Sequence, residues 1–117
     1  MKKTNYRIGL AAEALCRVAL RLKGYSIIAA RYRSPVGEID IIAKRGHSLA
    51  LVEAKARPSG DIAAEAIQKR HRQRLENAAG DFLARHPHLG KHELRFDVMP
   101  VAPWRWPVHI ADAWRPE

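Results

Sequence analysis

The sequence predicts one mixed α/β domain, spanning residues 1–117, in which helices pack against a sheet. Two long segments carry apolar residues at helical spacing, and the segments between and after them are rich in β-branched and apolar residues. The expected order is α-β-β-β-α-β-(β), with the final strand in the tail. A length of 117 residues suits one domain with one core.

The first helix is expected over residues 6–23. Its apolar residues recur at spacings of four and three and form one stripe: Ile8, Ala12, Leu15, Ala19 and Leu22. Gly24 stands where a glycine commonly ends a helix. Cys16 lies beside the stripe and is interpreted as a small core residue.

Three strands are expected next, at residues 25–33, 37–45 and 48–56. The first is rich in β-branched and aromatic residues and ends before Ser34-Pro35. Gly46-His47 separates the other two. A glycine at the first position of a two-residue connection predicts a hairpin with a type II′ turn.

A second helix is expected at about residues 62–85, capped by Ser59 or Asp61. One side of it is lined by Ala64, Ile67, His71, Leu75, Ala78 and Phe82. His71 lies on this apolar side and is interpreted as a hydrogen-bonded core histidine rather than a catalytic group.

A loop at residues 86–90 leads to a fourth strand at 94–101, in which Asp97 is interpreted as structural. A fifth strand is expected near residues 107–111. Trp104, Trp106 and Trp114 could stack on nucleic-acid bases, but core packing or a dimer contact is the favoured interpretation of all three.

The charge balance favours a polyanionic partner. Lysine and arginine number 21 against 12 aspartates and glutamates, which gives a net charge of +9. A single cysteine excludes an internal disulfide and a cysteine-based zinc site, and fits a reducing compartment. Charged residues interrupt the apolar stretch that follows the basic N-terminus, so we expect no secretory signal, no membrane span and a cytoplasmic location.

The expected hairpin at residues 37–56 contains the main candidate catalytic residues. With Arg45 paired to Ser48, Asp40 lies opposite Glu53 and Glu38 lies opposite Lys55. Alternation places Glu38 and Asp40 on one face of their strand, and Ile39 and Ile41 on the other. Two opposed carboxylates repel unless a proton or cation lies between them, and their hard oxygens suit Mg²⁺ or Mn²⁺.

A solvent-exposed face stabilised by a Glu38–Lys55 ion pair is the simpler interpretation of the same charges. It explains Lys55 but does not explain why two acids oppose each other. A register shift of one residue would place the acids on opposite faces and remove the metal site.

The chain resembles the YraN family of small uncharacterised bacterial proteins, which belongs with the restriction-endonuclease-like superfamily and is similar in pattern to archaeal Holliday-junction resolvases. The superfamily's Asp…Glu-X-Lys signature corresponds to Asp40 and Glu53-Ala54-Lys55. Further segments match in family order: Gly9…Glu13-Ala14, Gly24-Tyr25, Gly37-Glu38-Ile39-Asp40, Val52-Glu53-Ala54-Lys55-Ala56-Arg57, Gln68-Lys69 and Arg95-Phe96-Asp97-Val98. Ala12 and Ala54 depart from the usual glycine and valine without changing a charged position.

The resemblance implies a restriction-endonuclease-like fold with a mixed central sheet flanked by helices. It also implies roles for individual residues. Asp40 and Glu53 would bind Mg²⁺ or Mn²⁺ with the Ala54 carbonyl as a third ligand, and Lys55 would orient the attacking water. Glu13 would reach the metal from the first helix, although an i,i+4 pair with Arg17 is an equal alternative.

Residues around these ligands complete the expected site. Glu38 and Gln68 would contact the metal ligands rather than the metal and help to position them. A basic cluster in the second helix would contact phosphates without reading sequence: Lys69, Arg70, Arg72 and Arg74. A solvated helix face is the alternative for that cluster.

These expectations lead to three functional hypotheses. The first is a metal-dependent endonuclease that hydrolyses DNA phosphodiester bonds, with branched structures as a candidate substrate and a homodimer as a candidate active form. The second is a nucleic-acid-binding module of the same fold without catalysis. The third is a basic adaptor that binds proteins.

Overall fold

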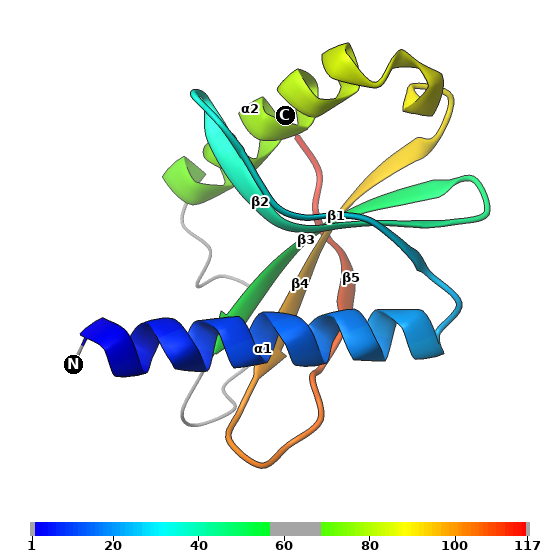
Figure 1. Ribbon diagram of the computed structural model, residues 1–117. Coiled ribbons are helices and arrows are strands. Elements are labelled where there is room, and N and C mark those ends of the chain that lie inside the picture. Colours follow the sequence, from blue (N-terminus) through cyan, green and yellow to red (C-terminus); the bar gives the residue numbers. More distant parts are fainter. Residues whose placement is uncertain (1, 57–68, 117) are drawn as a thin grey trace.

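The structure is a computed structural model, and it describes residues 2–56 and 69–116, with the backbone alone described for residues 2–7 and Lys69. The elements are α1 (Lys2–Leu22), β1 (Ser26–Ser34), β2 (Gly37–Arg45), β3 (Ser48–Ala56), α2 (Lys69–Arg85), the short 3₁₀ helix η2 (Pro87–Leu89), β4 (Glu93–Val101) and β5 (Ile110–Trp114) (Figure 1). The predicted α/β class and element order, including the fifth strand, are confirmed.

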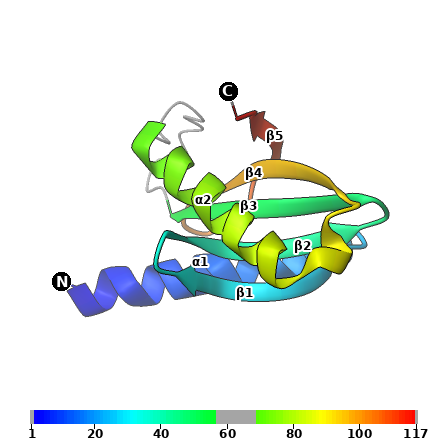
Figure 2. The same cartoon turned by 90° about the horizontal axis from the view of Figure 1, so that it is seen from above.

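The strands form one mixed sheet in the order β1-β2-β3-β4-β5. β3 and β4 run parallel, and the other neighbouring pairs run antiparallel. α1 covers one face of the sheet and α2 covers the other (Figure 2). One apolar cluster packs under each helix. The predicted arrangement of helices flanking a mixed sheet is therefore confirmed.

Helix α1 ends as predicted but buries a different stripe. The N–H of Tyr25 donates to the Leu20 carbonyl at 3.0 Å, and Gly24 adopts a φ of 92° that favours glycine. Residues Ala12, Cys16, Ala19 and Leu20 are buried against the sheet. The prediction was wrong at both ends of the stripe, because Ile8 is 51% exposed and Leu22 is 75% exposed. Leu22 lies about a quarter of a turn away from the buried face.

Strands β2 and β3 have the predicted bounds. Their pairing begins with Arg45 opposite Ser48 and continues to Ile41 opposite Val52, as the predicted register requires. Gly46 has a φ of 60°, which the first central position of a type II′ turn needs. Strand β1 begins one residue later than predicted.

The side chains of β2 do not alternate regularly at Asp40. Ile39 packs in the apolar cluster under α2, whereas Ile41 packs in the cluster under α1. The prediction that Ile39 and Ile41 share a face was therefore wrong. Arg31 lies opposite Asp40, between residues paired to Ile41 and Ile39, and has a φ of 56°. This backbone conformation is uncommon for a residue with a long side chain, and such strain often accompanies functional sites.

Helix α2 is described from Lys69 onward, so its predicted start, its caps Ser59 and Asp61, and the stripe residues Ala64 and Ile67 lie outside the described residues. The rest of the predicted stripe is buried at Leu75, Ala78 and Phe82. The loop at residues 86–90 contains η2. None of the helices in the described ranges is both long and apolar enough to span a membrane.

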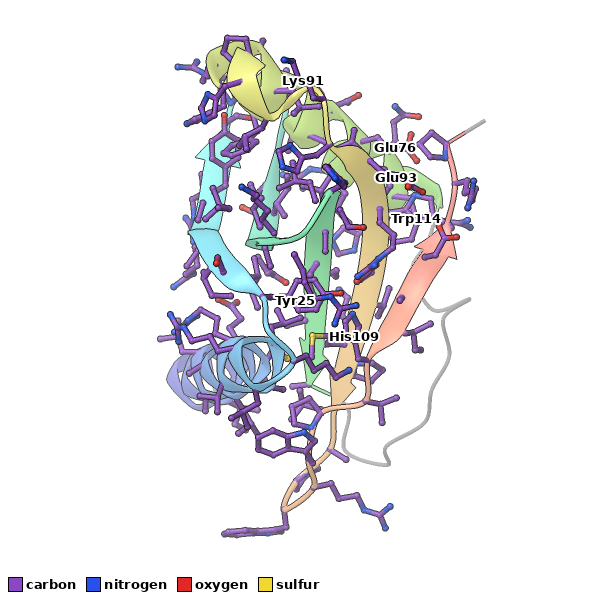
Figure 3. All side chains as sticks on the ribbon, turned by 90° about the vertical axis from the view of Figure 1, so that its right-hand side faces the viewer. Tyr25, Glu76, Lys91, Glu93, His109 and Trp114 are labelled. Carbon is purple, nitrogen blue, oxygen red and sulfur yellow. The ribbon has the colours of Figure 1, made fainter. Side chains whose placement is uncertain are left out.

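Strand β5 begins three residues later than predicted, and Trp114 explains its position. Trp114 is buried, stacks on Phe96, and donates its indole N–H to Glu76 of α2 at 3.0 Å (Figure 3). These contacts stabilise the packing of β5 against β4 and α2. Core packing is therefore the role of Trp114.

Asp97 has a structural environment, as interpreted from the sequence. It is fully buried and accepts hydrogen bonds from Arg95, from His109 at 2.7 Å and from the backbone N–H of Asp112. Burial would raise the pKa of Asp97, but these donors lower it to about 2. His109 in turn lies beside Tyr25 (Figure 3).

Candidate active site

Asp40 lies where β2 and β3 stop pairing. The described register ends at Ile41 and Val52, and beyond it Oδ2 of Asp40 accepts the backbone N–H of Ala54 at 2.9 Å. A side-chain oxygen thus replaces the carbonyl that would accept this N–H in a regular ladder. The same carboxyl group is hydrogen bonded to Glu53, so the two acids meet in the gap between the strands.

The pKa values of the two carboxyl groups shift in opposite directions. Burial, the hydrogen bond to Glu53 and the negative charge of Glu53 raise the pKa of Asp40 well above its ordinary value. Burial would also raise the pKa of Glu53, but hydrogen bonds from His71 and Asp40 and the charge of Lys55 lower it. These opposite shifts favour Asp40 as the protonated donor and Glu53 as the carboxylate acceptor.

Glu53 has two further nitrogen partners. The Lys55 ammonium lies 3.1 Å from Glu53 Oε2, and His71 Nε2 lies 2.8 Å from the same oxygen. The other ring nitrogen of His71 lies 3.5 Å from Lys55 Nζ. Among the ion pairs of the described residues, Lys55 pairs with Glu53 and not with Glu38, so the simpler interpretation of the hairpin charges was wrong about this pair.

His71 is a site residue that the sequence interpretation missed. Its side chain is 39% exposed and hydrogen bonds to Glu53, so its interpretation as a core histidine was wrong. The available signal was its position one turn before the buried Leu75, on the side of α2 that faces the sheet. At that end of the helix the facing surface is the acidic gap between strands rather than the apolar core.

A small polar pocket adjoins Asp40. Its walls come from α1, β1 and β2, and it is lined by Glu13, Arg31, Arg33, Glu38, Ile39 and Asp40. Glu13 Oε1 lies 3.7 Å from Arg31 Nε. Among the described ion pairs, Glu13 pairs with Arg31 and not with Arg17, the alternative partner expected from the sequence. Burial raises the pKa of Glu13 against the opposing charges of these two arginines.

Arg31 and Arg33 were not identified from the sequence. Arg33 lies directly opposite Glu38 in the pairing of β1 with β2, and Arg31 lies opposite Asp40. The signal was present in the two arginines at alternate positions of β1. It becomes useful only with the register of that strand pair, which the two-residue connection Pro35-Val36 between the paired Ser34 and Gly37 sets.

The remaining predicted residues lie around this centre or outside the described part. Glu38 is exposed at the pocket wall, and Arg70 and Arg74 are exposed on α2. Arg72 is half-buried. Gln68 and the side chain of Lys69 lie outside the described residues.

The donor set fits a hard divalent cation bound partly by water. Within the described ranges, no three histidine, cysteine, aspartate or glutamate side chains form a ready-made cation site. However, the Asp40–Glu53 pair holds one proton in a place that a cation could take, and Glu13 Oε1 is buried without a hydrogen-bond partner among the described residues. Mg²⁺ is commonly held by one or two carboxylates and several waters, so these residues fit it.

Comparisons with known proteins place the chain among bacterial relatives. A family model described as uncharacterised protein family UPF0102 matches residues 12–101. A UPF0102 protein of Parvibaculum lavamentivorans is 55% identical over 111 residues, which cover 95% of this chain and 84% of the relative. A UPF0102 protein of Methylorubrum extorquens is 45% identical over 116 residues, covering 99% and 91%. The matched span includes Glu13, Asp40, Glu53 and Lys55.

Proposed function

Since the chain belongs to the uncharacterised protein family UPF0102, we propose from the geometry of its site that it is a divalent-metal-dependent nuclease that hydrolyses phosphodiester bonds, with DNA as its substrate. The observation that carries the proposal is the meeting of the Asp40 and Glu53 carboxyl groups in the gap between β2 and β3. The Lys55 ammonium lies beside them. Acids and a lysine in this arrangement suit phosphoryl chemistry.

Asp40 and Glu53 would hold Mg²⁺ or Mn²⁺, with the Ala54 carbonyl as a further oxygen donor and Glu13 as the next nearest acid. When bound, the ion supplies polarisation of the phosphate and a water of lowered pKa. Lys55 orients the attacking water and offsets the charge that develops on the phosphate oxygens.

The phosphate group would enter through the polar pocket. Arg31 and Arg33 line that pocket beside Asp40, and guanidinium groups can bind phosphate oxygens in a bidentate manner. Arg70, Arg72 and Arg74 on α2, with Lys69, would contact flanking phosphates. The net charge of +9 supports attraction of a polyanion to this surface.

The element order is that of restriction-endonuclease-like proteins, and the resemblance to archaeal Holliday-junction resolvases adds two finer parts to the proposal. The substrate would be branched or otherwise distorted DNA, and two copies of the chain would act as a homodimer on two strands. The protein would act in the cytoplasm.

The test is a cleavage assay with Mg²⁺ or Mn²⁺ on single-stranded, duplex, flap and four-way-junction DNA. Asp40→Asn and Glu53→Gln should lower the rate more than about 100-fold, since even supporting groups of metal sites cost about 10- to 100-fold when removed. Asp112→Asn removes an exposed charge from β5, away from the gap, and should leave the rate unchanged. Failure to cut any substrate, or equal cleavage by Asp40→Asn, refutes the enzymatic proposal.

A non-catalytic nucleic-acid-binding module is the second candidate, and one observation favours it. Glu53 already has Lys55 and His71 as partners, so the charge of this acid is balanced without a metal ion. Calorimetric titration with Mn²⁺ separates the two candidates: heat of binding that is lost in Glu53→Gln supports the nuclease, whereas no binding to the wild type supports the module.

A further inference from the structure

The loop between β4 and β5 displays two tryptophans to solvent. Trp104 is fully exposed and Trp106 is 54% exposed, whereas Trp114 is buried in the core. The rings of Trp104 and Trp106 therefore do not belong to the apolar core of the described residues. We call residues 102–108 the tryptophan loop.

The tryptophan loop is closed at its base. The N–H of Val108 donates to the Pro100 carbonyl at 3.0 Å, and the N–H of Arg105 donates to the Ala102 carbonyl at 3.2 Å. Trp104 has a φ of 60°, which is an unfavourable backbone conformation for a bulky residue. Its ring is exposed, so packing of the ring does not offset this cost. Because the base is hydrogen bonded and contains prolines, the rings are presented from a constrained backbone, which lowers the entropy lost on binding.

The tryptophan loop begins at the carboxyl end of β4, next to the carboxyl end of β3, where Glu53 and Lys55 lie. β3 and β4 run parallel, with Lys55 paired to Pro100 and Ala56 paired to Val101. Trp104 follows Val101 by three residues, a reach of at most about 10 Å. Figure 1 shows the connection from β4 to β5 extending from this end of β4. A strand of nucleic acid at Lys55 would therefore pass close to the tryptophan loop.

We infer that the tryptophan loop binds an unpaired base of nucleic acid by stacking, so that the substrate carries a single-stranded segment beside the phosphate at Lys55. This inference rests on the proposed function for its choice of ligand. An exposed indole offers a flat surface to any base, and Arg105, which stands between the two tryptophans in the sequence and is exposed, adds a cation for a phosphate. A stacked base fits this combination of flat rings and positive charge.

A second copy of the chain is a poorer occupant. A stable dimer interface buries about 800 Å² on each partner and has an apolar centre. The tryptophan loop has Arg105 at its centre, and two such loops facing each other would bring two positive charges together, so the proposed homodimer would form through another surface.

The experiment compares a fifteen-residue thymidine oligonucleotide with an abasic oligonucleotide of the same length and charge, in EDTA so that nothing is cleaved. Fluorescence anisotropy gives the affinity of the wild type and of Trp104→Ala/Trp106→Ala for both probes. We expect the wild type to prefer the thymidine probe, and the variant to lose about 5- to 100-fold of that preference. Affinity for the abasic probe should not change, and Trp104→Phe/Trp106→Phe should retain most of the preference.

An equal preference in wild type and double-alanine variant overturns the inference. It is also overturned if the wild type sediments as a dimer that the double-alanine substitution dissociates, since the loop then binds a second copy. The two proposals fail separately. Base preference without any cleavage activity supports the stacking site and refutes hydrolysis. Cleavage without base preference supports hydrolysis and refutes the stacking site.

Discussion

Replacing Asp40 by asparagine should stabilise the metal-free protein increasingly as the pH rises, and should abolish metal binding. Asp40 donates a hydrogen bond to Glu53 and accepts the N–H of Ala54 at 2.9 Å. An asparagine amide has the same shape, donates through its NH₂ group and accepts through its oxygen. The substitution can therefore keep both hydrogen bonds while removing the group that ionises.

The magnitude follows from proton binding. The folded chain raises the pKa of Asp40, first through burial and then through Glu53, whereas the unfolded chain leaves it at its ordinary value. Between these two pKa values the folded state holds one more proton, so the free energy of unfolding of the wild type falls by about 1.4 kcal/mol per pH unit. The asparagine of the Asp40→Asn variant does not titrate. From pH 6 to pH 8, the difference between the two proteins should widen by about 2 to 3 kcal/mol.

The assay is urea unfolding of both proteins in EDTA at the two pH values, followed by tryptophan fluorescence. Taking the difference between wild type and variant removes the contributions of groups that behave alike in both proteins. Asp40→Ala is the matched control, because it leaves the N–H of Ala54 without an acceptor and should cost about 1 to 3 kcal/mol. With Mn²⁺ at 100 times its Kd, the wild type should gain about 2.7 kcal/mol and Asp40→Asn nothing.

Two results would refute this reasoning. One is a constant difference between wild type and Asp40→Asn at pH 6 and pH 8, which would mean that Asp40 is not the proton carrier. The other is equal stabilisation of both proteins by Mn²⁺, which would mean that Asp40 is not a ligand.

Three further predictions concern the fold. A Cβ on Gly37 would lie 2.0 Å from the Arg74 carbonyl oxygen, so Gly37→Ala should lower the free energy of unfolding by at least about 1 to 3 kcal/mol in urea. Gly80→Ala, in open space on the same helix as Arg74, should instead stabilise by up to about 1 kcal/mol. The lowered pKa of Asp97 predicts that stability on the order of 2 kcal/mol is present above pH 4 and lost as the pH falls toward 2; Asp97→Asn should be less stable at pH 7 and lose less on acidification. Cys16 is buried, and burial raises the pKa of its thiol to about 12, so it should react with an aromatic disulfide reagent only after unfolding; rapid reaction of the native protein would contradict its burial.

The hairpin was predictable from the sequence because its determinants are local. Gly46 specifies the turn, the turn specifies the register, and the register brings Asp40 next to Glu53. The order of elements was also predictable, since apolar periodicity distinguishes helices from strands. Resemblance to a family, and not geometry, suggested Glu13.

Other parts of the site depend on distant segments. Arg31 reaches Glu13 through the pairing of β1 with β2, and His71 reaches Glu53 because α2 packs on the face of the sheet to which Glu53 points. Neither contact follows from spacing along the chain. Trp104 and Trp106 resembled Trp114 as tail residues, yet only Trp114 is buried.

By itself, the sequence determined the α/β order, the hairpin register and the net positive charge, because these depend on neighbouring residues or on composition. The tertiary structure alone decided in which direction the pKa values of Asp40 and Glu53 shift, which nitrogen groups contact Glu53, and which tryptophans remain in solvent. Those features arise where β2 parts from β3 and where α1 and α2 meet the sheet from opposite faces. Burial and electrostatics at such junctions are set by residues far apart in the chain.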